Sequence, residues 1–118
     1  MTNPQCPKPH GIARIWKGQT SRENADEYTL YMHAEGVTKL QSLGARAVQF
    51  FREDRADCSE FMVISLWDTR EAMTRWAGTD PARIRHLERD PELLLILPDA
   101  VQILDVYSNS VFPSDAFR

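Results

Sequence analysis

Residues 61–78 of the chain, FMVISLWDTREAMTRWAG, decide the fold. The first half belongs to the apolar run of residues 60–68, which predicts a strand near the middle of a sheet. The second half predicts a helix over residues 70–77, with Asp68 or Thr69 as its N-cap. A central strand that leads directly into a helix therefore stands in the middle of the sequence.

The sequence predicts three more strands around this centre. Residues 10–17 and 45–53 have apolar side chains on alternate positions, and residues 100–107 form the last strand. A polar turn after the second strand predicts a hairpin with the third. The pairs Asp80-Pro81 and Asp90-Pro91 each place an acidic N-cap before a proline, which predicts two short helices ahead of the last strand.

A first helix is expected between the first two strands. Thr20 and Glu23 fit a capping box, in which each side chain bonds to the backbone N–H at the other position. The helix is expected to run to about Glu35, with Tyr28 on its buried stripe, and to stop at Gly36.

The element order β-α-β-β-α-β is typical of the ferredoxin-like α+β fold, an antiparallel four-stranded sheet with both helices on one face. We expect this domain over residues 10–108, with a disordered tail over residues 1–9 and a second tail over residues 109–118. Several strands carry apolar side chains on both faces, so a single copy would expose an apolar sheet face. A homodimer that buries this face is the simplest expectation.

Composition narrows the class of protein. The 118 residues are 42% hydrophobic and 26% charged, with a net charge of −3, which argues against a nucleic-acid partner. The longest apolar run, residues 93–97, is far too short to span a membrane, and the proline-rich N-terminus without an apolar core leads us to expect no secretory signal. Cys6 and Cys58 lack metal-ligand spacing, so we expect two thiols in a cytoplasmic protein.

The chain resembles the antibiotic biosynthesis monooxygenase (ABM) superfamily of dimeric α+β barrels. The resemblance rests on IARIWKG at residues 12–18, on the segment 61–78 and on the closing strand, and it covers residues 11–107. It implies a small monooxygenase that acts on an aromatic or quinol-like substrate without a bound organic cofactor. Other members degrade haem, and many have no known activity, so a haem protein and a non-enzymatic small-molecule-binding dimer remain alternatives.

Trp67, Trp76 and His86 form the first candidate group. The haem-degrading members carry a Trp followed ten residues later by a haem-ligating His, so this resemblance implies that Trp76 contacts haem and His86 binds its iron. The first strand has no Asn like that of the haem-degrading members, which argues against haem degradation. Alternatively, the three residues line a pocket that holds no haem, or both tryptophans belong to the core and His86 lies at the surface.

Arg14, between apolar neighbours on the first strand, is the third candidate catalytic residue after His86 and Trp76. A buried guanidinium must be paired, and it could hold a substrate carboxylate or phenolate. A structural ion pair with Asp68, Asp105 or Glu60, or a contact with the dimer partner, would also satisfy it. The sequence leaves these alternatives open, because a one-residue shift in register reverses the face.

Four aromatic residues are the candidate substrate-binding residues. Cofactor-free oxygenases deprotonate an electron-rich phenol, whose anion then reduces oxygen inside a water-poor pocket. Such a pocket needs apolar walls, a hydrogen-bond partner and positive charge for the anion. The walls are expected to include Trp16, Tyr28, Tyr31 and Trp67, although aromatic residues at helical spacing also occur as ordinary core.

Overall fold

The computed structural model describes residues 8–77, 87–98 and 100–109, with the backbone alone at residues 75–77. The strands are β1 Gly11–Thr20, β2 Ala47–Asp54, β3 Ser59–Trp67 and β4 Gln102–Val106. The helices are α1 Ala25–Tyr31, the π-helical segment η1 Met32–Val37, α2 Thr38–Ser42, α3 Arg70–Ala77 and α4 Asp90–Leu93. No helix within these described ranges is long and apolar enough to cross a membrane.

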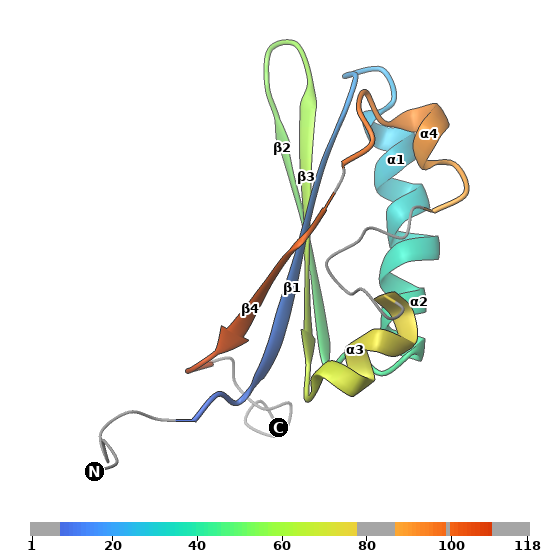
Figure 1. The fold of residues 1–118 in the computed structure, drawn as a ribbon. Helices are drawn as coiled ribbons and strands as arrows, with labels where there is room; N and C mark the ends of the chain where they lie inside the picture. Colours follow the sequence, from blue (N-terminus) through green and yellow to red (C-terminus); the bar gives the residue numbers. More distant parts are fainter. Residues whose placement is uncertain (1–7, 78–86, 99, 110–118) are drawn as a thin grey trace, which may run out of the picture.

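The four strands form one sheet in the order β2-β3-β1-β4, and every neighbouring pair is antiparallel. All the helices lie against one face of this sheet (Figure 1). The predicted ferredoxin-like architecture and the hairpin between β2 and β3 are therefore confirmed.

The two faces of the sheet differ because side chains alternate along each strand. On β1 and β3, the side chains that face the helices are all buried: Ile12, Arg14, Trp16, Phe61, Val63, Ser65 and Trp67. The ring of Tyr28 from α1 lies 6.3 Å from that of Trp16 and 5.1 Å from that of Phe61. These contacts fix α1 over the centre of the sheet.

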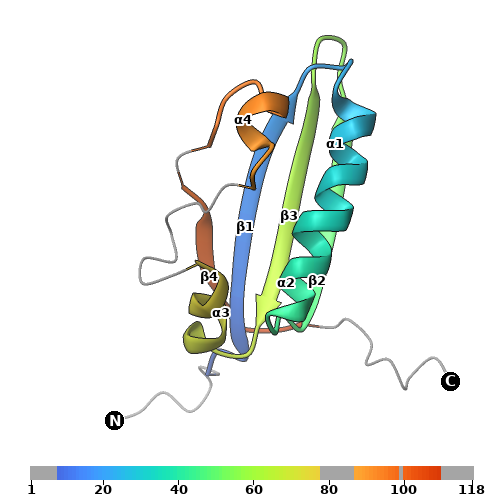
Figure 2. The ribbon, with the colours of Figure 1, turned by 90° about the vertical axis from the view of Figure 1, so that its right-hand side faces the viewer.

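The prediction that the first helix stops at Gly36 is wrong. Segments α1, η1 and α2 follow one another as one helical column along the sheet (Figure 2). Gly36 is buried inside this column, where a Cβ atom would collide with the Met32 sulfur and touch Leu87. Glycine therefore serves close packing here, and the column ends instead before Gly44, whose φ of 112° suits a helix C-terminus.

The predicted capping box is also wrong. Thr20 is the last residue of β1, and its hydroxyl donates to the carbonyl of Ser21. The Ser21 hydroxyl oxygen accepts a hydrogen bond from the backbone N–H of Asn24 at 3.2 Å, just before α1. The polar residues therefore form a turn that precedes the helix.

Other boundaries agree more closely with expectation. Helix α3 spans the predicted residues, and Thr69 caps it by accepting from the backbone N–H of Ala72 at 3.1 Å. Helix α4 begins at Asp90, as the proline pattern predicts. The short helix predicted at Asp80-Pro81 lies outside the described residues.

A buried hydrogen bond connects α1 with the segment before β4. Tyr28 Oη donates to Asp90 Oδ1 at 3.0 Å, and Asp90 Oδ2 accepts from the backbone N–H of Leu87 at 2.9 Å. Burial first, and then the nearby Asp90 carboxylate, raise the pKa of Tyr28 well above its usual range, so the phenol stays protonated. Because both side chains are buried, the hydrogen bond from Tyr28 to Asp90 joins α1 to the segment before β4 without competition from water.

Replacing Tyr28 with Phe should destabilise the fold by about 1–3 kcal/mol, because it leaves a buried carboxylate oxygen without its phenol donor. Urea unfolding followed by circular dichroism measures this loss. Tyr107→Phe, at an exposed position, is the matched control and should leave the midpoint unchanged. Equal midpoints for the two variants would contradict a stabilising role for this bond.

Candidate functional site

Arg14 lies in the middle of β1 on the face that is covered by the helices. Its side chain is only 5% exposed, and its direct neighbours across the strand pairs are Ser65 on β3 and Ile103 on β4. The register therefore directs Arg14 toward the interior between sheet and helices, away from the open sheet face. This answers the question of orientation that the sequence leaves open.

Burial changes the electrostatics of Arg14 without removing its charge. Desolvation lowers the pKa of the guanidinium from 12.5 to about 10. At neutral pH the side chain is still protonated in all but about one molecule in a thousand. A permanent cation therefore lies inside an apolar layer of the protein, where it attracts anions far more strongly than a surface cation does.

Two of the carboxylates considered for Arg14 bond to other arginines. Asp68 accepts from Arg46 at 3.1 Å on the surface. Glu60 points to the open face and accepts from Arg55 at 3.1 Å. Both ion pairs lie at the exposed periphery of the sheet, where they contribute little to the stability of the fold.

Ser65 and Trp67 complete the polar part of the interior next to Arg14. Trp67 Nε1 donates a hydrogen bond to Ser65 Oγ at 2.9 Å, and both side chains are about 2% exposed. The sequence analysis missed Ser65. The signal was present, because a serine on the same face as Trp67 interrupts the apolar inner positions of β3.

The structure places the other predicted aromatic residues in two surroundings. Trp16 and Tyr28 belong to the buried core, and the protonated Tyr28 phenol cannot act as a base. Tyr31 is half-buried, its hydroxyl oxygen accepts from the backbone N–H of Arg89 at 2.9 Å, and the Arg89 guanidinium lies 5.6 Å from its ring centre. Arg14, Trp16 and Trp67 thus share one sheet face, with Tyr28 and Tyr31 on α1 above the sheet.

Two predicted residues, Trp76 and His86, receive no test from the structure. The backbone of Trp76 lies near the end of α3, and its side chain is outside the described part. His86 lies entirely outside the described residues.

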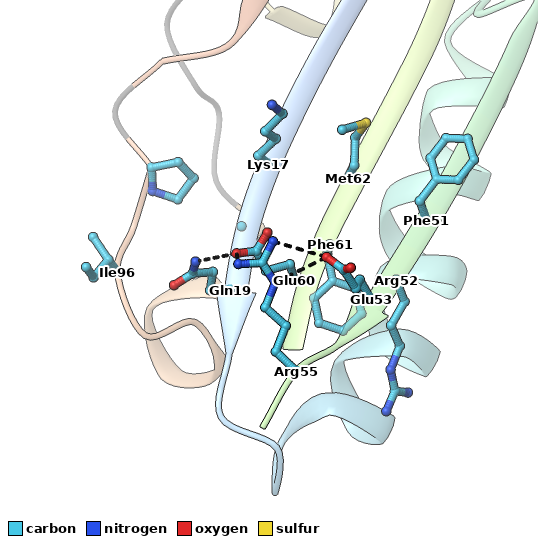
Figure 3. Close-up of a pocket in the computed structure, with 12 residues that line it drawn as sticks. Lys17, Gln19, Phe51, Arg52, Glu53, Arg55, Glu60, Phe61, Met62 and Ile96 are labelled. Atoms are coloured by element: carbon cyan, nitrogen blue, oxygen red, sulfur yellow. Dashed lines mark hydrogen bonds and ion pairs between the residues drawn. The ribbon is translucent and has the colours of Figure 1, made fainter. Parts of the chain in front are cut away.

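A separate groove of about 700 Å³ lies on the open face of the sheet (Figure 3). Phe51 and Met62 form part of its apolar surface, and Ile96 lies on the opposite side. Its polar side contains Arg55 and Glu60, which are joined by an ion pair. Since Arg14 faces away from this groove, the two features are independent.

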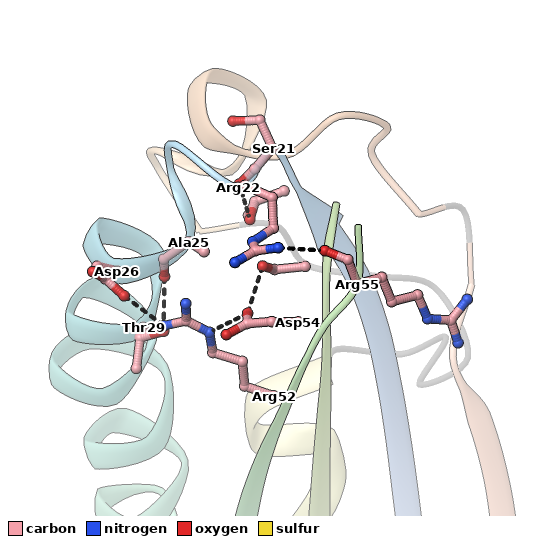
Figure 4. Close-up of polar contacts among 10 residues, drawn as sticks. Ser21, Arg22, Ala25, Asp26, Thr29, Arg52, Asp54 and Arg55 are labelled. Carbon is pink, nitrogen blue, oxygen red and sulfur yellow. Dashed lines mark hydrogen bonds and ion pairs between the residues drawn. The ribbon is translucent and has the colours of Figure 1, made fainter. Parts of the chain in front are cut away.

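Charged side chains tie the hairpin of β2 and β3 to α1 (Figure 4). Arg52 donates to Asp26 and to Asp54 at 2.8 Å each, and to the hydroxyl of Thr29 at 3.0 Å. These bonds raise the pKa of Arg52, and the Arg52 guanidinium lowers the pKa of Asp54. The charges of Arg52, Asp26 and Asp54 are paired with one another, so we assign this cluster a structural role.

Comparisons with known proteins support the fold. No protein-family model matches the sequence, and no curated protein sequence does either. A crystal structure from Bacillus cereus, provisionally described as an antibiotic biosynthesis monooxygenase, superposes with a TM-score of 0.59 at 12% identity. The match covers 87% of this chain and 99% of that chain. The resemblance drawn from the sequence is thus confirmed at the level of the fold.

Arg14→Met should keep or raise stability at neutral pH, because the depressed pKa means that folding disfavours the charged form by about 3 kcal/mol. The unfolded chain binds the proton more tightly than the folded protein does. The difference in the free energy of unfolding between wild type and Arg14→Met should therefore narrow as the pH rises through about 10. Urea unfolding measures both effects, with exposed Arg46→Met as control. A loss of several kcal/mol in Arg14→Met would instead identify Arg14 as a structural ion-pair partner.

Proposed function

We propose that the protein is an ABM-type monooxygenase that acts on a small aromatic or quinol-like substrate without a bound organic cofactor. The observation that carries this proposal is the buried, protonated Arg14 on the helix-facing side of the sheet, flanked along β1 by Ile12 and Trp16. Keeping a cation there costs stability, and active sites are where such costs are commonly retained. The Bacillus cereus protein of the same fold is provisionally described as a monooxygenase, which agrees with this proposal.

The chemistry requires an anionic substrate held away from water. A phenol or quinol that loses a proton can transfer electrons to O₂, and in the net reaction a CH₂ group and O₂ become a carbonyl group and water. Arg14 would stabilise the substrate anion, which lowers the pKa of the substrate itself. The aromatic walls from Trp16 and Trp67 would exclude water.

Oxygen uptake tests the proposal directly. The purified protein should consume O₂ with anthrone as the probe, whose CH₂ group becomes a carbonyl group, and Arg14→Met should lower this rate by roughly 100-fold, as the loss of one charge that stabilises an anion does. Arg46→Met, an arginine on the surface, should retain the wild-type rate. Uptake no faster than in buffer, or an unchanged rate in Arg14→Met, would refute the proposed activity.

The alternatives make different predictions. A haem protein with His86 as the iron ligand should give a saturable Soret band that is lost in His86→Ala. A non-enzymatic dimer should bind aromatic ligands and consume no O₂. A cytoplasmic location, expected from the two cysteines, also stays a prediction.

We further propose that the open sheet face pairs with a second copy of the chain. This face presents an apolar strip on which Phe51 is 47% and Leu104 is 45% exposed. The strip continues between them across β3 and β1 with Ala13, Ile15, Met62, Ile64 and Leu66. Lys17 and Glu53 of opposite charge lie on the same face, so a two-fold pairing can bring unlike charges together.

Ile64→Glu should convert a wild-type dimer into a monomer, because it places a charge at the centre of this strip. Sedimentation velocity at micromolar concentration measures the change. Leu30→Glu is the matched control, since Leu30 is 74% exposed on α1, on the opposite side of the sheet. A wild-type monomer, or an Ile64→Glu dimer, would rule out this interface.

A further inference from the structure

The groove on the open sheet face is bounded on one side by an exposed apolar segment, residues 95–97 (Figure 3). The backbone N–H of Leu95 donates to the carbonyl of Gln19 at 2.9 Å, so the segment lies beside the hairpin end of β1, on the side away from β3. Its side chains are exposed by 54% at Leu95, 75% at Ile96 and 37% at Leu97. Three consecutive exposed aliphatic side chains are typical of a surface that contacts a partner.

The rest of the groove has an apolar floor and a charged end. Met62 on β3 and Phe51 on β2, which is 47% exposed, are direct partners in the register and form the floor. At the hairpin end, Arg55 pairs with both Glu53 and Glu60, at 3.1 Å each. One guanidinium between two carboxylates leaves one negative charge uncompensated at this end of the groove.

Lys17 carries the charge that balances this end of the groove. It lies beside Met62, its direct partner in the register of β1 and β3, and it lines the same groove. Within the described part of the chain, its ammonium group forms no ion pair. A surplus cation and a surplus anion on one face make that face self-complementary, because a two-fold axis brings each charge against the other in a second copy.

The open face is built from rows of side chains that run across the four strands. In the central row, the order from β2 to β4 is Gln49, Ile64, Ile15 and Gln102. In the next row away from the hairpin, the order is Ala47, Leu66, Ala13 and Leu104. A two-fold axis that runs parallel to the strands, between β1 and β3, places β1 over the partner's β3 and β2 over the partner's β4.

This axis makes the rows complementary in size and in polarity. Ala13 faces the partner's Leu66, so a small side chain meets a large one, as close packing requires. The amide of Gln49 faces the amide of the partner's Gln102, so two polar groups that can bond to each other meet at the edge. The apolar centre of the face is thus buried without leaving a polar group opposite an apolar one.

The same axis also fills the groove. In the row nearer the hairpin, the partner's segment 95–97 lies over Phe51, and the partner's Lys17 lies over Met62. The partner's ammonium group is then next to Glu53 and Glu60, where one negative charge is uncompensated. Each copy receives from the other the charge and the apolar side chains that its own groove lacks.

A two-fold axis across the strands, through the central row, would also bury apolar side chains. It would place Lys17 opposite the partner's Ala13, far from the partner's Glu53 and Glu60. Charges that lose water at an interface without meeting an opposite charge weaken the association. Charge therefore favours the axis parallel to the strands.

We infer that the groove is a socket for a second copy of the chain, which places its segment 95–97 and its Lys17 there by rotation about a two-fold axis parallel to the strands. The inference rests on the pairing of open faces proposed above, and it adds the occupant of the groove and the orientation of the partner. The groove of about 700 Å³ is then part of an interface between copies.

Cross-linking of cysteine variants tests the orientation. In a chain that carries Cys6→Ser and Cys58→Ser, Gln49→Cys or Gln102→Cys adds one thiol at an exposed position of the central row. Sheets packed face to face lie about 10 Å apart, so a short bis-maleimide joins thiols that face each other. We expect covalent dimers when the two variants are refolded together from urea, and few from either variant alone.

The unmixed variants are the matched controls for this experiment. Covalent dimers from Gln49→Cys alone and from Gln102→Cys alone, with no gain on mixing, would indicate an axis across the strands and overturn the inference. The absence of covalent dimers from every sample, or a wild type that sediments as a monomer, would also overturn it.

Reversal of charge tests the occupant of the groove. Lys17→Glu should raise the dissociation constant of the dimer by roughly 10- to 100-fold, because it places a carboxylate beside the partner's Glu53 and Glu60. Adding Glu53→Lys to the same chain should restore most of the affinity, since the two exchanged charges meet again. Sedimentation velocity over a series of protein concentrations measures both effects.

Lys39→Glu is the control for the change in net charge, because Lys39 is exposed on α2, on the other side of the sheet. It should leave the dissociation constant unchanged. An effect of Lys17→Glu no larger than that of Lys39→Glu, or no recovery with Glu53→Lys, would remove Lys17 from the groove of the partner and overturn the inference.

The proposals can fail separately. A dimer that Ile64→Glu dissociates, but that gives covalent dimers from the unmixed variants, would keep the pairing of open faces and refute the orientation. Oxygen uptake is expected to depend on Arg14, which lies on the other face of the sheet. The oxygenase can therefore be refuted while the mixed cross-link and the charge reversal still support the socket.

Discussion

The antiparallel pairing of β1 with β3 is the constraint on which the rest of the structure depends. Ile12 pairs with Trp67 at one end and Thr20 with Ser59 at the other, so one register holds along the whole of both strands. A shift by a single residue would exchange the two faces and move the interior side chains to the open side. This register therefore brings Arg14 and Ser65 together and leaves an apolar strip on the opposite face.

The interior divides into two regions with different chemistry. Around Tyr28, ring centres lie 5.1 and 6.3 Å apart, and the buried carboxylate of Asp90 accepts two hydrogen bonds, so these polar groups stabilise the fold. Around Arg14, burial lowers the pKa of the cation, and the neighbouring Ser65 oxygen accepts the indole N–H of Trp67. The polar groups around Tyr28 stabilise the fold, whereas a buried cation is a group that active sites commonly retain.

The sequence predicted the features that depend on local pattern. Alternation placed Arg14 on the same face as Trp16, and the fold class followed from the order of the elements. Prediction failed at Gly36, where the helical column continues past a residue that usually ends helices and the Met32 sulfur packs where a Cβ atom would lie. The bond between Trp67 and Ser65 was beyond reach because it depends on side-chain rotamers as well as on spacing.

The distant fold relationship and the buried Arg14 limit the function of the protein to different degrees. The fold at 12% identity accommodates many activities, so it limits the architecture and leaves the reaction open. The buried Arg14 is more specific, because a cation held in an apolar layer would favour ligands that carry negative charge. Arg14 therefore separates the proposed activities better than the fold does, since only an activity on an anionic ligand depends on its charge.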